Sequence, residues 1–479
     1  MGYDMIANIG RTPTPASATQ FGRTAVRTAL LASVCFFVAE GSALAAGTGT
    51  WNGSVSKDVT VDANWSGGTY TGPTDAILVV TDVAPQPSPV LREPDAVTVD
   101  RVRIDSGLFG VSGDLTATNG VRVVGGRLAV SGTGSIVGKT MIGAAGTAVN
   151  AGTIGDVTNK GAFSNTGNAG IVTNSGTAAN AATRTVAALV NGGGTFKNAG
   201  VITGDTAVTA GTVTVTDVGS IAGETTIGPA GTVANAGTVD DVTNKGTFSN
   251  TKTGKAGTVT NTGTGTNAGT VAALVNDGGT FGNTGTIDGA ATVNAGTLTS
   301  TGTIGGDLTN KATTNAAGKI GGAIDNSGTL NVTGKLVAGG TVDNTGTFEV
   351  KAGTTSGITT FTNGSKLIVD GGATLTIAGS LDNKAGGTVD VKAGGTLNDT
   401  LSNDGTVTNA GTYNADVTTN TGTIDNSGTW NGDVASSAGK LTNSGSWNGA
   451  ITPSGTFTNT ATGTVAGAVT NSGTASNAG

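Results

Sequence analysis

Acidic residues are the first candidates for chemistry in this sequence. The adjacent Asp240 and Asp241, and the series Asp95, Asp100 and Asp105, come closest to the paired carboxylates of a polysaccharide-degrading enzyme or to a calcium site. Adjacent side chains of a strand point to opposite faces, so Asp240 and Asp241 cannot act together on a strand. We therefore interpret these carboxylates as solvated turn charges.

The residue types that are missing argue against an enzyme. His is absent from the 479-residue sequence, which removes the commonest general base at neutral pH and the commonest transition-metal ligand. The only cysteine is Cys35, and neither a Gly-Asp-Ser-Gly protease motif nor an array of Gly-Gly-x-Gly-x-Asp calcium repeats occurs. We expect no catalytic, cofactor-binding or metal-binding residues. A secreted β-helical polysaccharide-degrading enzyme is the main alternative to a non-enzyme.

Aromatic residues give the remaining candidate site. Many of them follow Gly-Thr or Gly-Ser, and Trp430 and Trp447 each lie in a Trp-Asn-Gly step, 17 residues apart. One interpretation is an internal stack, in which rings of successive coils pack in place of a globular core. The other is a solvent-facing platform for sugars, with Trp430 and Trp447 as the ligand contacts.

The first residues indicate export. A polar, basic segment leads into an apolar run from Ala29 to Ala39, and the segment ends in an Ala-Leu-Ala sequence at Ala45. This order is typical of a secretory signal peptide, and the run is shorter than the ~20 residues that span a bilayer. We predict a signal peptide over residues 1–45, cleaved between Ala45 and Ala46.

Internal repetition organises the rest of the chain. Residues 142–165 and 227–250 are identical at 18 of 24 positions, at an offset of 85 residues. Self-similarity of this kind is the signature of a repeat architecture. We predict an N-terminal β-rich segment over residues 46–135 and a repeat region over residues 136–479. The repeat region contains a duplicated block at about residues 142–226 and 227–311.

A shorter unit recurs within these blocks: Asn-x-Gly, usually followed by Thr and a β-branched or aromatic residue, as at Asn150, Asn174 and Asn326. Asn and Gly accept positive φ, so each step predicts a corner, and the Thr-Val or Thr-Phe pair predicts a short strand. Such short strands gain stability only by stacking on the next coil. The sequence therefore predicts an all-β parallel solenoid of degenerate Gly-, Thr-, Asn- and Val-rich repeats.

Two segments after the leader resemble the start of autotransporter passenger regions of Gram-negative bacteria. They are Thr50-Trp51-Asn52-Gly53-Ser54 and Asp62-Ala63-Asn64-Trp65-Ser66. The resemblance implies a right-handed parallel β-helix outside the cell that frequently serves as an adhesin, with a C-terminal β-barrel in the outer membrane. The chain ends in repeat sequence instead, so we expect attachment only through a barrel absent from it. The resemblance supplies no active-site motif to map onto these residues.

Charge limits the partners. The formal net charge is -7 and charged residues make up 11% of the chain, without the Lys and Arg clusters that neutralise nucleic-acid phosphates. We therefore expect no nucleic-acid partner and no cofactor. The repeats and the resemblance predict a structural or adhesive protein, secreted or at the cell surface. Its expected partners are host cell surfaces, extracellular matrix or glycans, or copies on other cells. A passive disordered or low-complexity stalk is the second alternative.

Overall fold

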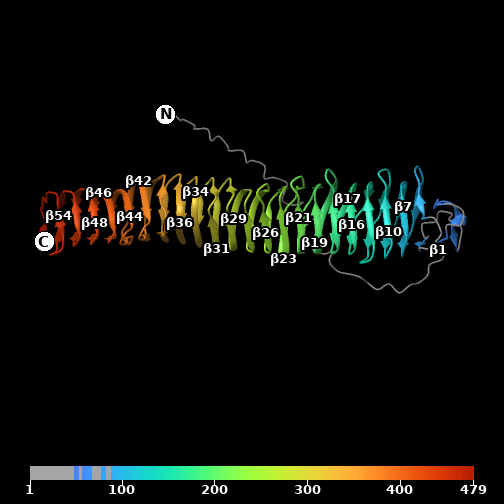
Figure 1. Ribbon diagram of the computed structural model, residues 1–479, viewed down its shortest axis with the longest axis horizontal. Helices are drawn as coiled ribbons and strands as arrows, with labels where there is room; N and C mark the ends of the chain where they lie inside the picture. The colour runs from blue at the N-terminus through green and yellow to red at the C-terminus, as the bar shows by residue number, and fades with distance from the viewer. Residues whose placement is uncertain (1–47, 53–56, 67–76, 82–87) are drawn as a thin grey trace, which may run out of the picture. The chain divides into compact units, whose positions relative to one another are not determined.

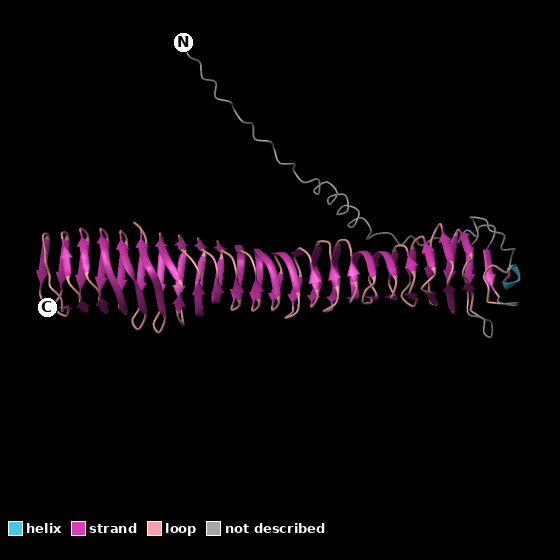
Figure 2. Cartoon of the chain, turned by 90° about the horizontal axis from the view of Figure 1, so that it is seen from above, coloured by secondary structure: helices cyan, strands magenta, loops and turns pink. Residues whose placement is uncertain are grey.

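A computed structural model of the chain describes residues 48–52, 57–66, 77–81 and 88–479. The predicted signal peptide and its cleavage site at Ala45 and Ala46 lie outside these residues. The fold is all-β, with 64% of the residues in strands, and forms a parallel β-solenoid of about 23 turns (Figures 1 and 2). The described residues contain one short 3-10 helix, η1 (Asp62–Asn64). The predicted parallel β-helix is confirmed.

Each turn of the solenoid adds one segment to each of three parallel sheets. We call them sheets A, B and C. In three early turns, sheet A consists of β7 (Leu108–Val111), β10 (Arg127–Val130) and β13 (Thr147–Asn150). Sheet B consists of β8 (Asp114–Ala117), β11 (Ser135–Val137) and β14 (Thr153–Ile154), and sheet C of β9 (Val121–Val123), β12 (Thr140–Ile142) and β15 (Val157–Asn159). The pairing is parallel and in register, as in the series Phe109, Leu128 and Ala148. Hydrogen bonds between equivalent side chains join residues 15 to 20 positions apart along the chain. One turn of the solenoid therefore takes about 15 to 20 residues.

The first described strands differ from the rest. Strand β1 (Thr48–Trp51) pairs antiparallel with β2 (Trp65–Ser66) and parallel with β3 (Ile77–Val80). The buried Trp51 and Trp65 rings meet edge to face, with centroids 5.0 Å apart. From β3 onward the described pairing is parallel, and it continues without interruption across residue 135.

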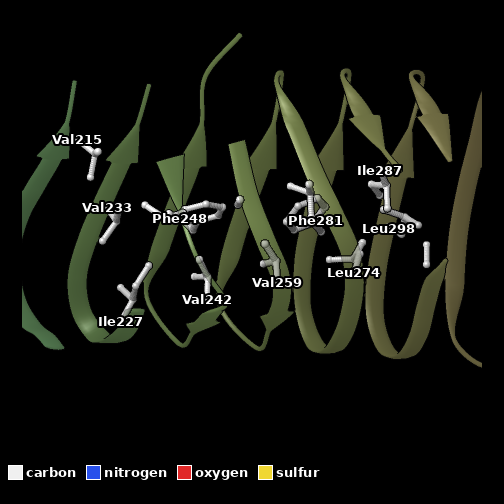
Figure 3. Packing of buried hydrophobic residues seen from close by; sticks show 14 of the residues in the cluster. Val215, Ile227, Val233, Val242, Phe248, Val259, Leu274, Phe281, Ile287 and Leu298 are labelled. Atoms are coloured by element: carbon white, nitrogen blue, oxygen red, sulfur yellow. The ribbon is translucent and has the colours of Figure 1, made fainter. Parts of the chain in front are cut away.

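Apolar side chains alternate along each strand and fill the interior of the solenoid (Figure 3). In one column of sheet A, small residues separate two pairs of rings: Ala178 lies between Phe163 and Phe196, and Gly265 lies between Phe248 and Phe281. A Cβ at Gly265 would lie only 2.3 Å from Cδ2 of Phe281. The Phe281 ring therefore occupies the space beside Gly265, and a small residue at position 265 preserves close packing.

Some strands run around a corner from one sheet into the next. Examples are β19 (Thr185–Asn198) and β21 (Thr206–Val215) in the first copy of the duplicated block, and β29 (Thr270–Asn283) and β31 (Ala291–Ser300) in the second. The bounds of each pair differ by the offset of 85 residues that separates the two sequence copies. The secondary structure thus repeats with the sequence.

The glycines of the Asn-x-Gly corners serve a purpose other than the expected one. We expected them to supply positive φ, but most do not; positive φ occurs at a few, such as Gly296 in the Asn294-Ala295-Gly296 step, and at glycines outside these steps, for example Gly107 and Gly120. A Cβ on Gly263 would lie 2.3 Å from the carbonyl oxygen of Gly246, and one on Gly279 would lie 1.9 Å from that of Gly263. Glycine is therefore required here by the close approach of successive turns.

This stacking predicts different costs for two Gly→Ala changes. We expect Gly279→Ala to lower the unfolding free energy by about 1–3 kcal/mol, because its methyl group would overlap backbone of the turn below. Gly132→Ala, whose Cβ would have nothing within 4 Å, is the matched control. Urea unfolding followed by circular dichroism measures both. Equal midpoints for the two variants would contradict the close-approach argument.

Candidate functional site: corner amides, an aromatic column and a polar face

The Asn residues of the repeats lie inside the solenoid at the ends of the sheet A and sheet C strands. Asn174 is fully buried, and its Nδ2 atom donates to Gly176 O of its own turn at 3.1 Å. The same Nδ2 atom lies 2.7 Å from Oδ1 of Asn191 on the next turn and 3.0 Å from the carbonyl oxygen of Thr195. Each such side chain therefore ties its own corner to the following turn.

These contacts form two ladders of buried amides. In sheet A the amide-to-amide bonds join the series Asn150, Asn165, Asn180 and Asn198, then Asn235, Asn250, Asn267 and Asn283, and later Asn409, Asn426, Asn443, Asn459 and Asn477. In sheet C they join Asn159, Asn174 and Asn191, then Asn244, Asn261 and Asn276, and finally Asn310, Asn326, Asn344, Asn363, Asn383, Asn403 and Asn420. The motif that the sequence presents as a turn signal is thus also a source of buried hydrogen bonds.

The acidic candidates Asp240 and Asp241 differ in their contacts. Oδ1 of Asp241 accepts the backbone N–H of Thr258 on the next turn at 2.8 Å, and Asp240 is exposed beside it. Elsewhere Asp156 and Asp307 accept backbone N–H groups of following turns in the same way, at 2.9 and 2.8 Å. These carboxylates therefore pair with backbone at a corner, which the interpretation as solvated turn charges did not include.

The series Asp95, Asp100 and Asp105 is also dispersed. Asp105 forms an ion pair with Arg103 at 2.7 Å, and the Asp100 carboxylate accepts a hydrogen bond from Asn119. Across the described residues there is no group of three or more His, Cys, Asp or Glu side chains placed to hold a metal ion. Asp105 thus pairs within its own turn and Asp100 with the next turn.

Trp430 and Trp447 point into the solenoid, so the expectation of a solvent-facing sugar platform is wrong. The two side chains are 0% and 1% exposed, and their rings stack with centroids 4.7 Å apart and planes inclined by 9°. Tyr413 precedes them in the same column of sheet B, 4.3 Å from Trp430. These rings form an internal aromatic column, because strand alternation turns Tyr413, Trp430 and Trp447 inward on β46 (Thr412–Asn420), β48 (Thr429–Asn431) and β51 (Ser446–Asn448).

Each polar tip of the aromatic column needs an acceptor at the corner between sheets B and C. Trp430 Nε1 donates to Ala415 O at 3.0 Å, and Trp447 Nε1 donates to Gly432 O at 3.2 Å. The Tyr413 hydroxyl donates instead to Oδ2 of Asp399, at 3.0 Å. A side-chain carboxyl thus takes the place that main-chain carbonyls take in the next two turns.

Asp399 is an unusual acid. The residue as a whole is only partly buried, but its Oδ1 atom is enclosed and has no hydrogen-bond partner among the residues that the structure describes. Burial raises the pKa of Asp399 to about 8, although the hydrogen bond from Tyr413 acts in the opposite direction. Burial, with the charge and hydrogen bond of Asp399, also raises the pKa of Tyr413 well above 10.

The outer surface of sheet B above the aromatic column carries only hydroxyl and amide side chains. We call this surface the polar face; it consists of Thr374, Thr376, Thr396, Asn398, Thr412, Asn414, Thr429, Asn431, Ser446 and Asn448. Asn448 Nδ2 donates to Asn431 Oδ1 at 2.8 Å, and Asn431 Nδ2 donates to Asn414 Oδ1 at 2.7 Å. The ladder continues from Asn414 to Asn398 at 2.6 Å. Sequence reasoning missed this face because it concentrated on the tryptophans next to these asparagines.

The buried ladders predict a large effect of a single amide. Asn344 accepts from Asn326 Nδ2 at 2.7 Å and donates to Asn363 Oδ1 at 2.8 Å and to Lys366 O at 2.9 Å. We expect Asn344→Ala to lower the unfolding free energy by about 2–4 kcal/mol, because it leaves buried groups on both neighbouring turns without partners. Denaturant titration measures the loss. Asn448→Ala, at the exposed end of the outer ladder, is the control and should change stability by less than about 1 kcal/mol.

Asp399 predicts a pH dependence of stability. An unfolded Asp ionises near pH 3.9, whereas the folded carboxyl ionises near pH 8. Between these values the folded chain holds one more proton, so the stabilisation present below about pH 4 is lost at ~1.4 kcal/mol per pH unit as pH rises towards 8. Asp399→Asn retains an acceptor for Tyr413 and does not titrate. Thermal unfolding across this range should show a shallower pH dependence for the variant; identical slopes would contradict the assignment.

Comparisons with known proteins supply no family for this chain. No family model matches it, and no curated protein matches its sequence. Among the described residues, no helix has the length and apolar character needed to cross a membrane. A proposed function therefore rests on the geometry of the solenoid, its buried amide ladders and its polar face.

Proposed function

We propose that the chain is an exported structural and adhesive repeat protein of a cell surface, similar to an autotransporter passenger, that binds host surfaces, extracellular matrix or glycans. Export rests on the leader predicted over residues 1–45, which lies outside the described residues. The adhesive activity rests on the polar face of sheet B. The solenoid supplies the rigid support on which that face is displayed.

The dimensions of the solenoid suit display at a distance. With about 23 turns and a strand spacing of ~4.8 Å, the stack extends to roughly 110 Å. Backbone hydrogen bonds and the buried amides connect each turn to the next, as at Asn344 and Asn363. A protein of this form can hold a binding surface away from its point of attachment without a large globular core.

The polar face is the observation that carries the adhesive part of the proposal. An amide group has two N–H donors and two acceptor lone pairs, and in the outer ladder one donor of Asn414 and of Asn431 is used between turns. The remaining donor and lone pair of each amide are available to a ligand. A regular array of uncharged donors and acceptors matches the hydroxyl groups of a glycan, whereas it offers no charge to an anionic polymer.

A binding comparison tests the proposal. We expect purified residues 46–479 to bind host cells, matrix proteins or arrayed glycans. The double variant Asn431→Lys, Asn448→Lys should weaken that binding by at least about tenfold, because it places bulk and charge on the polar face. The matched control is Thr226→Lys, Thr243→Lys, which changes the outer column of sheet C. Equal loss in both variants, or binding to none of these targets, would contradict adhesion through the polar face.

The same preparation separates the main alternative. Release of reducing sugars from polysaccharides by the purified chain would favour the polysaccharide-degrading enzyme instead. Circular dichroism of each variant should retain the β signal of the unmodified chain, so that a loss of binding can be assigned to the surface. A variant that loses this signal reports on folding alone.

A further inference from the structure

Both buried ladders are interrupted over several successive corners between Asn198 and Asn235. Elsewhere the sheet C ladder is interrupted at the single position Val293, and the sheet A ladder is apolar from Ala316 to Val391. Between Asn198 and Asn235, three successive corner positions are apolar: Val208 in sheet C, Val215 in sheet A and Ile227 in sheet C. All three are 0% exposed, and Val215 and Ile227 point into the core (Figure 3). We call residues 199–234 the unclamped segment. Main-chain pairing continues through it, for example from Thr206 N to Glu224 O at 2.9 Å.

Towards the unclamped segment, the Asn side chains that precede it donate to backbone carbonyl oxygens of that segment, not to side-chain amides. Asn198 Nδ2 donates to Ser220 O at 2.9 Å, and Asn191 Nδ2 donates to Ala210 O at 3.0 Å. Neither reaches a side-chain amide on the following turn, because Val215 and Val208 occupy those positions. Turn-to-turn contact across this segment thus depends on backbone pairing, apolar packing and a hydrogen bond from the backbone N–H of Glu224 to Asp205 Oδ1 at 3.0 Å, without the amide-to-amide bonds found before and after it.

Buried hydroxyl groups lower the local stability further. Thr206 and Thr225 occupy the inner column of sheet C, where Leu189 and Val242 lie on the turns before and after them. Within the described part of the chain, the Oγ1 atoms of Thr206 and Thr225 are buried without a hydrogen-bond partner, as is that of Thr216. An enclosed hydroxyl without a partner keeps its desolvation cost.

Two further features of the unclamped segment weaken it. Pro229 lies within β23 (Thr225–Asn235) and has no N–H to donate to a neighbouring turn. Val218, in the turn between sheets A and B, has an exposed fraction of 65%, the largest among the exposed large apolar residues. The segment therefore combines fewer hydrogen bonds between turns with an accessible turn of chain.

The second copy of the duplicated block is a built-in comparison. At the offset of 85 residues, Thr206 corresponds to Ala291 and Val215 corresponds to Ser300. Ser300 Oγ accepts a hydrogen bond from Asn283 Nδ2 at 3.1 Å, so the sheet A ladder extends one turn further in the second copy. Ala291 fills the inner column without a hydroxyl. Sheet C is apolar at the equivalent positions of both copies, Val208 and Val293, so the copies differ in sheet A, where the second keeps the Asn283–Ser300 hydrogen bond.

We propose that the solenoid opens first at the unclamped segment, which divides the rod into two cooperatively folded parts. In a repeat protein each turn contacts only its neighbours, so cooperativity between two stretches depends on the interface that joins them. The interface with the fewest bonds opens at the lowest free energy. The segment then acts as the built-in release point of the rod, where it yields while the clamped stretches on either side stay folded.

Hydrogen exchange on the full chain tests this directly. Backbone amides of β21 (Thr206–Val215) should exchange at least about tenfold faster than those of the equivalent strand β31 (Ala291–Ser300). Limited proteolysis should cleave first near Val218. Equal exchange in β21 and β31, or first cleavage elsewhere in residues 88–479, would overturn the proposal.

Two substitutions give the first copy the residues of the second. Val215→Ser supplies an acceptor for Asn198, and Thr206→Ala removes a buried hydroxyl without a partner. Together they should slow exchange in β21 towards the rate of β31 and leave β31 unchanged. If Val215→Ser disturbs folding, Thr206→Ala alone should still slow exchange. Unchanged exchange in β21 of a folded variant would show that these residues do not set the opening.

Discussion

Hydrogen bonding between successive turns is the interaction on which the rest of this structure depends. A strand of three or four residues, such as β15 (Val157–Asn159), is too short to be stable alone. It becomes stable because its backbone pairs with the turns before and after it, and because Asn159 adds a side-chain bond to Asn174 at 2.7 Å. The glycine that follows many of the corner asparagines, such as Gly263 after Asn261, lets the turns approach closely enough for both kinds of bond. The Asn- and Gly-rich composition, the solenoid fold and its rigidity therefore all follow from hydrogen bonding between successive turns.

This dependence explains why the chain can carry an extended surface with few aromatic residues. Short strands that end in a corner Asn bury a single apolar side chain, as β16 (Ala162–Asn165) does, and large rings pack along the axis, as in the column of Tyr413, Trp430 and Trp447. The outer surface is then free to vary, and on sheet B it presents the polar face. The proposed adhesive role uses this separation, since changes to outer residues leave the corner amides and the core intact.

The sequence predicts the architecture well and the site poorly, for physical reasons. Asn-x-Gly followed by Thr and an apolar residue predicts a corner and a strand, and stacked short strands predict the solenoid. Strand periodicity also allows Trp430 to be assigned to either side of a sheet, and only the register settles that it points inward. Asp399 carries no local signal, because its burial depends on the turn that brings Tyr413 over it. The polar face likewise appears only once equivalent residues of different turns are aligned.

Apolar residues replace Asn at different places along the corner columns of sheets A and C. Sheet A carries Val332, Val350, Val369 and Val391 at its corners, while the sheet C amides run without a break from Asn310 to Asn420. An apolar residue inside a run of amides would strand a donor above and an acceptor below, whereas one at the end of a run strands a single group. Drift in such a sequence should therefore move the borders of polar and apolar runs and rarely interrupt them, so that the history of the repeats is preserved in the lengths of these runs.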